Sequence, residues 1–308
     1  MKNALLIRFG GLGDLIVALP SIRFLRAKFP EARLTLVSRK RYGDLFLEAG
    51  VVDDILPEDS RRLLPLFDAK ASLNREFADW LGTFDFITAW TQGSAEDFLL
   101  KAPGIQAANV RPDVIQAGPG MSESLSRIFF RETAKALGES VPPSIEEWSR
   151  LSLPAVSKDF GYRIVVHPGS GSEAKRWPLQ NFLKIIEELG EKRIGGALVT
   201  GEAEENMDVE IGKAALPLNW TWIRCPSVLS LAGLLNATGL YLGNDSGVTH
   251  LAAACGAEVV ALFRNEFASA WRPFGRVELL SAVSPGEIGL ESVREILFSR
   301  LRIKNFSP

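Results

Sequence analysis

The sequence predicts an α/β protein of two doubly wound, Rossmann-like domains, with mostly parallel sheets that face a central cleft. Short apolar runs alternate with segments of helical periodicity, which is the pattern of a parallel sheet flanked by helices. The alternation stops at a stretch rich in proline and serine, residues 141–158, and then restarts. The chain also has 308 residues, about twice the usual domain length. We therefore expect one domain over residues 1–155 and a second over residues 156–308.

The N-terminal half is expected to contain four strands and a long helix. The helix follows a glycine-rich turn, since apolar residues recur at helical spacing from Leu15 to Phe29. Pro20 is expected to kink this helix or to begin its regular part. The strands are expected at Ala4–Phe9, at Leu34–Ser38, near Val51 and at Phe84–Trp90.

The C-terminal half repeats the alternation of strands and helices. Three strands are expected to begin at Tyr162, Gly196 and Gly239, each leading into a polar loop, and a fourth to occupy Glu258–Phe263. Helices are expected at Pro178–Leu189, after the third loop and at Pro285–Leu301. The last of these helices is amphipathic and is expected to dock on either domain, including the N-terminal one.

Composition excludes several classes of protein. Lys and Arg number 35 against 37 Asp and Glu, a net charge of −2, whereas a nucleic-acid-binding protein usually carries a basic excess. No uncharged apolar run approaches the roughly 18 residues that span a bilayer, and the apolar stretch before Arg8 is too short for a signal peptide. Two cysteines and two histidines are too few for a disulfide framework or a Cys/His zinc cluster. We expect a protein of the reducing cytoplasm with no metal site.

The first glycine-rich loop contains Gly10, Gly11 and Gly13 and leads to Asp14 at the start of a helix. It lacks the third glycine of a dinucleotide fingerprint, so a dinucleotide is not the expected ligand. Asp14 has two interpretations. Its carboxylate either caps the N-terminus of the helix or acts as a general base that faces the cleft.

The second loop, HPGSGSEAKRWP, begins at His167 and offers Gly and Ser donors together with Lys175. These groups suit an anion, although the spacing is not that of a P-loop. The alternative is a solvated loop that only opens the next helix. His167 is interpreted as a structural residue at the end of a strand.

The third loop, GNDSGVTHLAAACG, places Asp245, Ser246 and Gly247 where a strand gives way to a helix. The free N–H groups and partial positive charge of a helix N-terminus favour a pyrophosphate there. His250 lies on the same helical face as Ser246, either as a ligand-binding residue or as a half-buried structural one. Glu202, in a neighbouring loop, either accepts hydrogen bonds from ribose hydroxyls or is a surface acid.

Four segments, RFGGLGDLIVALP, HPGSGSEAKRWP, TGE and GNDSGVTHLAAACG, occur in an order and spacing that resemble glycosyltransferase family 9. Its best-known members are the ADP-heptose:lipopolysaccharide heptosyltransferases of Gram-negative bacteria. The resemblance covers nearly the whole chain and implies a GT-B type fold and inverting sugar transfer, with no essential metal and no cofactor. It implies that Asp14 is the catalytic base. It also implies that the donor-binding residues are Ser170, Gly171, Lys175, Glu202, Asp245, Ser246, Gly247 and His250.

The expected function is transfer of a sugar, heptose by this resemblance, from a nucleotide diphosphate donor such as ADP-heptose to a lipopolysaccharide core acceptor. Asp14 would deprotonate the acceptor hydroxyl, while Lys175 and the helix N-terminus at Ser246 would stabilise the leaving diphosphate. One alternative is a transferase of the same fold with another nucleotide sugar or acceptor. Others are a Rossmann oxidoreductase or epimerase and a non-catalytic nucleotide-binding protein.

An anionic glycolipid acceptor is expected at the N-terminal domain, with peripheral contact at the cytoplasmic face of the inner membrane. Residues 1–41 carry a net charge of +7 in a chain of −2, and a local positive field steers anions. The alternative is that acids from later segments balance these charges. The residues expected to contact the acceptor are Gly11, Gly13, Arg39, Lys40 and Arg41.

Overall fold

The computed structural model describes residues 1–66, 75–90, 121–140, 144–153 and 162–303. These residues form two compact units, and the chain passes from unit 2 to unit 1 between Ser122 and Glu123 and back to unit 2 between Arg150 and Leu151. Unit 1 comprises residues 1–66, 75–90, 123–140 and 144–150, and unit 2 comprises residues 121–122, 151–153 and 162–303. The predicted boundary at 155 lies outside the described residues. Each unit holds one parallel sheet, so the predicted α/β class is confirmed.

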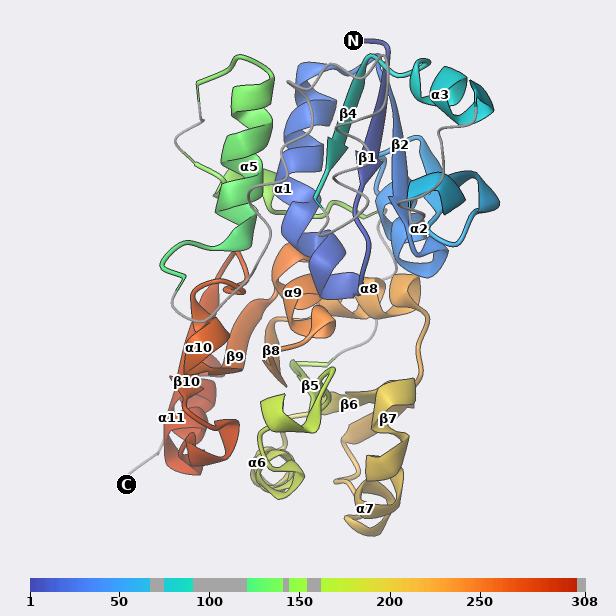
Figure 1. The fold of residues 1–308 in the computed structure, drawn as a ribbon. Coiled ribbons are helices and arrows are strands. Elements are labelled where there is room, and N and C mark those ends of the chain that lie inside the picture. Colours follow the sequence, from blue (N-terminus) through green and yellow to red (C-terminus); the bar gives the residue numbers. More distant parts are fainter. Residues whose placement is uncertain (67–74, 91–120, 141–143, 154–161, 304–308) are drawn as a thin grey trace. The chain divides into compact units, whose positions relative to one another are not determined.

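Unit 1 contains a four-stranded parallel sheet of order β3-β2-β1-β4 (Figure 1). Its strands are β1 (Asn3–Ile7), β2 (Arg33–Ser38), β3 (Asp54–Pro57) and β4 (Phe86–Ala89). Its α-helices are α1 (Leu12–Lys28), α2 (Lys40–Glu48), α3 (Arg75–Leu81) and α5 (Leu125–Ala136). Two 3-10 helices occupy Arg61–Leu66 and Glu146–Trp148. Pro20 lies inside α1, which continues through it without a break in the helix.

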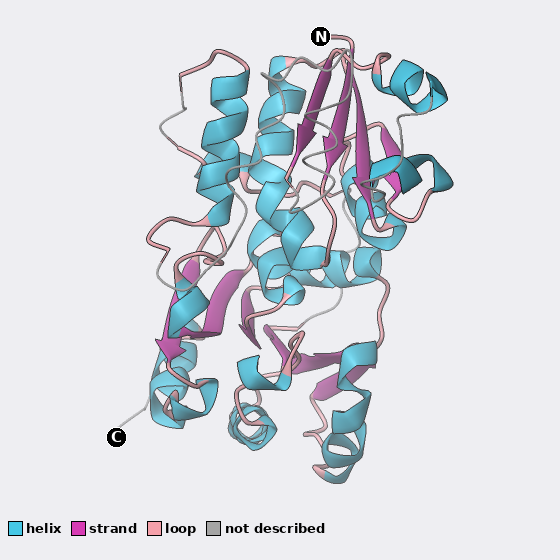
Figure 2. Cartoon of the chain, viewed as in Figure 1, coloured by secondary structure: helices cyan, strands magenta, loops and turns pink. Residues whose placement is uncertain are grey.

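Helix α1 packs against α5 on one face of this sheet (Figure 2). Ser126 Oγ on α5 donates to the carbonyl of Val17, 2.8 Å away, and satisfies a group on α1. The Phe24 ring meets Phe130 of α5 edge to face, with centroids 5.3 Å apart. The two helices are therefore held together by aromatic packing and by a buried hydrogen bond.

Unit 2 contains a six-stranded parallel sheet of order β10-β9-β8-β5-β6-β7. Its strands are β5 (Ile164–His167), β6 (Gly196–Thr200), β7 (Trp220–Arg224), β8 (Leu240–Asn244), β9 (Glu258–Arg264) and β10 (Val277–Ala282). Its α-helices are α6 (Leu179–Glu191), α7 (Asp208–Lys213), α8 (Val228–Ala237), α9 (Gly247–Ala254), α10 (Asn265–Ala268) and α11 (Leu290–Arg300). Three 3-10 helices occupy Glu173–Lys175, Glu202–Met207 and Pro285–Glu287.

The core of unit 2 fills the space between the sheet and three helices, α6, α7 and α11 (Figure 1). Alternate strand residues such as Ile164 and Val166 point into it, as the period of two in a strand requires. The last helix contributes Val293, Leu297 and Phe298 to this core. The apolar face of this helix therefore packs on unit 2, one of the two domains on which it was expected to dock.

Each sheet reverses its strand order beside its first strand. In unit 1 the strands β2 and β3 extend to one side of β1, and β4 lies on the other side. In unit 2 the strands β6 and β7 extend to one side of β5, and β8 lies on the other. Ligands of doubly wound sheets bind outside the carboxyl ends of the strands at this switch point. The three glycine-containing loops follow β1, β5 and β8, so all three begin at a switch point.

No helix in the described part of the chain is both long enough and apolar enough to cross a bilayer.

Candidate active site

Asp14 lies in the first turn of α1 at the switch point of unit 1, and its carboxylate is held by two donors. Arg8 Nη2 donates to Asp14 Oδ1 at 2.7 Å, and the backbone N–H of Gly11 donates to Oδ2 at 2.9 Å. The side chain is still 33% exposed. An ionised carboxylate that is oriented by fixed donors and remains open to solvent can accept a proton from a bound hydroxyl.

Gly11, not Asp14, is the N-cap residue of α1. The interpretation of Asp14 as the cap itself is therefore wrong by position, although its carboxylate does accept from the N-cap N–H. Gly10 has a φ of +114°, and a Cβ there would lie 2.7 Å from Asp14 Oδ2. The glycine is required both by the left-handed backbone and by the space that the carboxylate occupies. Gly13 lies inside α1.

Asn244, at the end of β8, joins the two loops of the switch point in unit 2. Its side chain is fully buried, donates to the carbonyl of Pro168 at 2.7 Å and accepts from the N–H of Trp177 at 2.9 Å. Ser170 Oγ adds a bond of 2.7 Å to the carbonyl of Asp245. The loop after β5 is thus fixed against the end of β8 at three points.

Lys175 forms an ion pair with Asp245, with Nζ 2.7 Å from Oδ2. Asp245 is buried, whereas the Lys175 side chain is 31% exposed and lies over the ring of Phe267. The predicted phosphate-binding cation and the predicted turn acid are therefore direct neighbours. Gly171 is exposed in the same loop.

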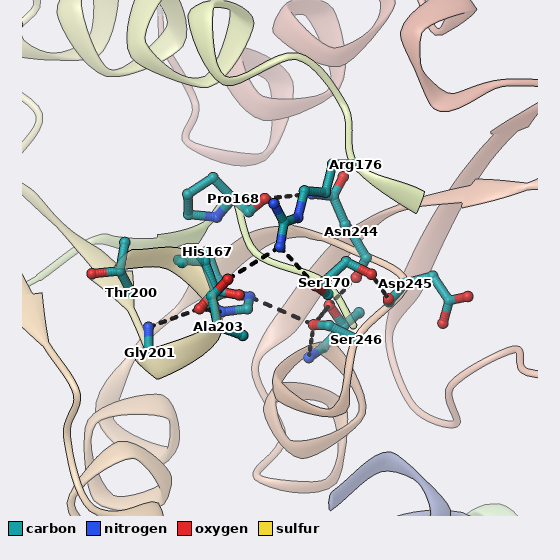
Figure 3. A network of polar contacts seen from close by, with 12 residues as sticks. His167, Pro168, Ser170, Arg176, Thr200, Gly201, Ala203, Asn244, Asp245 and Ser246 are labelled. Atoms are coloured by element: carbon teal, nitrogen blue, oxygen red, sulfur yellow. Dashed lines mark hydrogen bonds and ion pairs between the residues drawn. The ribbon is translucent and has the colours of Figure 1, made fainter. Parts of the chain in front are cut away.

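Ser246 is the N-cap of α9, and Gly247 is the first residue of this helix. Ser246 Oγ accepts from the N–H of Thr249 and lies 3.5 Å from His167 Nδ1 (Figure 3). His250 is buried, with its ring 6.2 Å from that of Trp271. The helix N-terminus beside Lys175 supplies partial positive charge at the carboxyl end of β8.

The acid after β6 that faces this network is Glu204, which the sequence analysis did not single out. Glu202 is exposed, whereas Glu204 is buried and its Oε2 accepts from the N–H of Gly201 at 2.8 Å. His167 Nε2 lies 3.6 Å from the same oxygen. Burial alone would raise the pKa of Glu204, but His167 and the N–H of Gly201 outweigh it and hold this pKa below its ordinary value.

Arg176 is a second residue that the sequence analysis missed. Its Nη2 donates to the carbonyl of Ser170 at 3.3 Å and to that of Ala203 at 3.2 Å, which links the loops after β5 and β6 (Figure 3). The spacing Gly201-x-x-Glu204 is that of a capping box, in which the third residue of a helix accepts from the N-cap N–H. This spacing is the local signal in the sequence from which Glu204, rather than Glu202, could have been identified.

We expect Glu204→Gln to destabilise unit 2 by about 1 to 3 kcal/mol at neutral pH. The substitution removes the negative charge that the N–H of Gly201 and the buried His167 ring face in the wild type. The pKa of Glu204 is lowered from 4.5 by folding, so the stability from its ionised form is present above that pH and is lost as the pH falls further. The difference between the variant and the wild type should therefore narrow below pH 4.5. Denaturant unfolding at several pH values measures it. Glu202→Gln, at an exposed acid of the same loop, is the matched control. If the stability difference between Glu204→Gln and the wild type stays constant down to acid pH, the lowered pKa of Glu204 is contradicted.

The basic residues of the first 41 positions are largely paired with acids. Arg39 pairs with Glu58 at 2.8 Å and Lys40 with Asp44 at 2.7 Å, while Arg41 stacks on Tyr42. Further pairs join Arg8 to Asp14, Arg26 to Asp53, Lys28 to Glu139 and Arg33 to Asp54. This is the arrangement of the alternative in which acids from later segments balance the charge. Among the described residues, no group of three or more His, Cys, Asp or Glu side chains is placed to hold a metal ion.

Comparison with known proteins gives one family and one fold. Residues 142–283 match the model of glycosyltransferase family 9 (heptosyltransferase), and this region contains all the donor-site residues named above. No curated protein sequence matches the chain. These residues therefore belong to glycosyltransferase family 9, as the motifs of the sequence predict.

Solved structures match over nearly the whole chain. A family 9 glycosyltransferase from Veillonella parvula has a TM-score of 0.77 at 14% identity and covers 98% of this chain and 97% of its own. ADP-heptose lps heptosyltransferase II of E. coli has a TM-score of 0.73 at 19% identity, covering 98% and 99%. E. coli heptosyltransferase WaaC with ADP has a TM-score of 0.71 at 16% identity, covering 97% and 100%. At these identities the likeness shows the fold, which is the GT-B type that the resemblance implies.

Proposed function

We propose that this chain, whose residues 142–283 belong to glycosyltransferase family 9, transfers a sugar from a nucleoside diphosphate donor with inversion at the anomeric carbon. The observation that carries the proposal is the grouping of Lys175, Ser170 and the N-terminus of α9 at the switch point of unit 2. A switch point with a cation and a helix N-terminus is suited to a diphosphate.

The proposed donor is ADP-heptose. The related E. coli heptosyltransferase WaaC has been solved with ADP, and heptosyltransferase II is described by its use of ADP-heptose. In this chain the diphosphate would contact Lys175, Ser246 and Gly247. Glu202 or Glu204, which both follow β6, would contribute at the nucleoside end, and Ser170, Gly171, Asp245 and His250 complete the proposed donor site.

The proposed reaction is a single displacement in which Asp14 is the base. Asp14 takes the proton of an acceptor hydroxyl as the hydroxyl oxygen attacks the anomeric carbon. The bond from that carbon to the diphosphate oxygen breaks, and the electron pair leaves with the nucleoside diphosphate. Lys175 and the N–H groups of α9 stabilise the negative charge that develops on it, so no protein acid is needed.

The proposed acceptor is a lipopolysaccharide core, bound by unit 1 near Gly11, Gly13 and Asp14. Arg39, Lys40 and Arg41 remain candidates for contact with its anionic groups. Since Arg39 and Lys40 are paired with Glu58 and Asp44, they would act through exchange of these partners rather than as an unbalanced positive field.

We expect Lys175→Ala to weaken ADP binding by about 1.5 to 3 kcal/mol, the range for a hydrogen bond to a charged group. The loss has two causes, since the variant removes the cation and also leaves the Asp245 carboxylate unneutralised beside the phosphates. Titration calorimetry measures the affinity.

Asp245→Asn is the matched control, because it breaks the same ion pair but keeps the cation. It should lose less of the affinity for ADP than Lys175→Ala does, because the cation that would face the phosphates is retained. Equal weakening in both variants would mean that the ion pair only maintains the loop, and unchanged affinity in Lys175→Ala would place the phosphates elsewhere.

A further inference from the structure

Arg8 is the most deeply buried arginine at either switch point, and nothing in the family resemblance assigns it a role. It follows β1 directly, and only 6% of its side chain is exposed. Removing a guanidinium from water is unfavourable unless its donors are satisfied. The surroundings of Arg8 therefore indicate what its charge is for.

The donors of Arg8 meet acceptors from two sides of the switch point. Nε donates to the carbonyl of Asp14 at 3.0 Å, and Nη2 donates to Asp14 Oδ1 at 2.7 Å. Nη1 donates to the carbonyl of Trp90, the residue that follows β4. The guanidinium also lies over the ring of Phe129 on α5, with its carbon 5.3 Å from the centroid.

The guanidinium of Arg8 binds both the backbone carbonyl and the side-chain carboxylate of Asp14. Because Nε holds the backbone carbonyl of Asp14 and Nη2 holds its carboxylate, the side chain cannot rotate without breaking a bond that the backbone contact keeps in place. The contact with Trp90 anchors the arginine itself to the neighbouring strand of the sheet. A lysine could supply the charge but not this planar set of donors.

We propose that Arg8 is a positioning residue that sets the direction in which the Asp14 carboxylate accepts a proton. This inference rests on the proposed function for its catalytic consequence. Arg8 and the N–H of Gly11 each bind one carboxylate oxygen, so the plane of the carboxylate is fixed and each oxygen keeps a lone pair that can take a proton. A base held in this way reaches the attacking hydroxyl without reorganisation.

The test compares Arg8→Met, Arg8→Lys and Arg294→Met. Arg294, on α11 of unit 2, makes a bidentate contact with Glu188 at 2.7 and 2.6 Å. Arg294→Met therefore also removes an arginine paired with a carboxylate, but in the unit that does not contain Asp14. Two quantities are measured for each protein: the kinetics of ADP release from ADP-heptose with a lipopolysaccharide core acceptor, and the NMR signal of the Gly11 amide. The second needs no substrate, because that amide donates to Asp14 Oδ2.

Arg8→Met should lower kcat by about 10²-fold, the effect of a misplaced catalytic group, and leave the KM for ADP-heptose unchanged. Its Gly11 amide signal should shift. Arg8→Lys should be intermediate in both quantities, and it keeps the test decisive if the methionine variant does not fold. Arg294→Met should keep the wild-type kcat and Gly11 signal.

The inference is overturned if Arg8→Met folds with a wild-type kcat, or if its Gly11 amide signal does not move. Absence of transfer by the wild-type protein would instead count against the proposed function. In that case the Gly11 signal alone still decides whether Arg8 positions Asp14.

Discussion

Asp14→Asn is expected to lower the rate of sugar transfer by about 10² to 10⁴-fold, the usual contribution of a positioned base. The amide can occupy the same space and still accept from Arg8 or Gly11, but it cannot take up the acceptor proton. The affinity for ADP should be unchanged, because the proposed donor residues all lie in unit 2. Steady-state release of ADP and calorimetry of ADP binding measure these two properties on the same preparation.

Asp54→Asn provides the control for this substitution. Asp54 is also a carboxylate of unit 1 in an ion pair with a basic residue, Arg33, but it lies on β3, at the edge of the sheet. It should retain the wild-type rate. If Asp14→Asn turns over as fast as the wild type, the carboxylate serves only to accept the N–H of Gly11.

Trp177→Ala is expected to destabilise unit 2 by about 3 to 5 kcal/mol, the range for removing a large buried aromatic side chain. Trp177 is 1% exposed, its Nε1 donates to the carbonyl of Ile288 at 2.9 Å, and its ring meets Phe182 at 5.0 Å. It also lies two positions after Lys175, so its packing fixes the loop that carries the proposed phosphate contact.

Hydrogen exchange of the amides in β5, β6 and β8 measures this loss within unit 2. Trp177→Phe is the control, since it keeps most of the apolar contact and loses only the indole N–H. It should show a smaller loss than the alanine variant. An alanine variant with wild-type protection of these strands would contradict the role of Trp177 as the anchor of the loop.

The central strands were predictable because both of their faces are buried. Strands β1, β5 and β8 are continuous apolar runs, and the structure places each within one or two residues of its expected position. Strands β7 and β10 were not predicted. They form the two edges of the sheet in unit 2 and are only partly buried, so their sequences lack a continuous apolar run.

The pairings within each site depended on contacts that local spacing does not reveal. Asp14 and Lys175 could be singled out from their loops, but Arg8 contacts Trp90 across 82 positions of the chain. Asn244 likewise joins Pro168 across 76 positions. Only the tertiary fold brings these partners together, because the carboxyl ends of parallel strands that are distant in sequence lie at the same edge of the sheet.

The charge of the first 41 residues shows the limit of counting along a segment. Their excess of basic residues is real in sequence, yet Asp44, Asp53, Asp54, Glu58 and Glu139 pair with residues of this segment in the fold. Four of these five acids come from the next 18 positions of the chain. A segment boundary drawn at residue 41 therefore separated cations from their partners.

The most direct measurement is the fate of ADP-heptose when the wild-type protein receives it together with a lipopolysaccharide core acceptor that lacks heptose. The proposed function predicts that ADP is released only when the acceptor is present, in amounts equal to the heptose transferred. NMR of the product should show an anomeric configuration opposite to that of the donor. A product that retains the donor configuration, or a protein that binds ADP-heptose and transfers nothing, would contradict inverting transfer with Asp14 as its base.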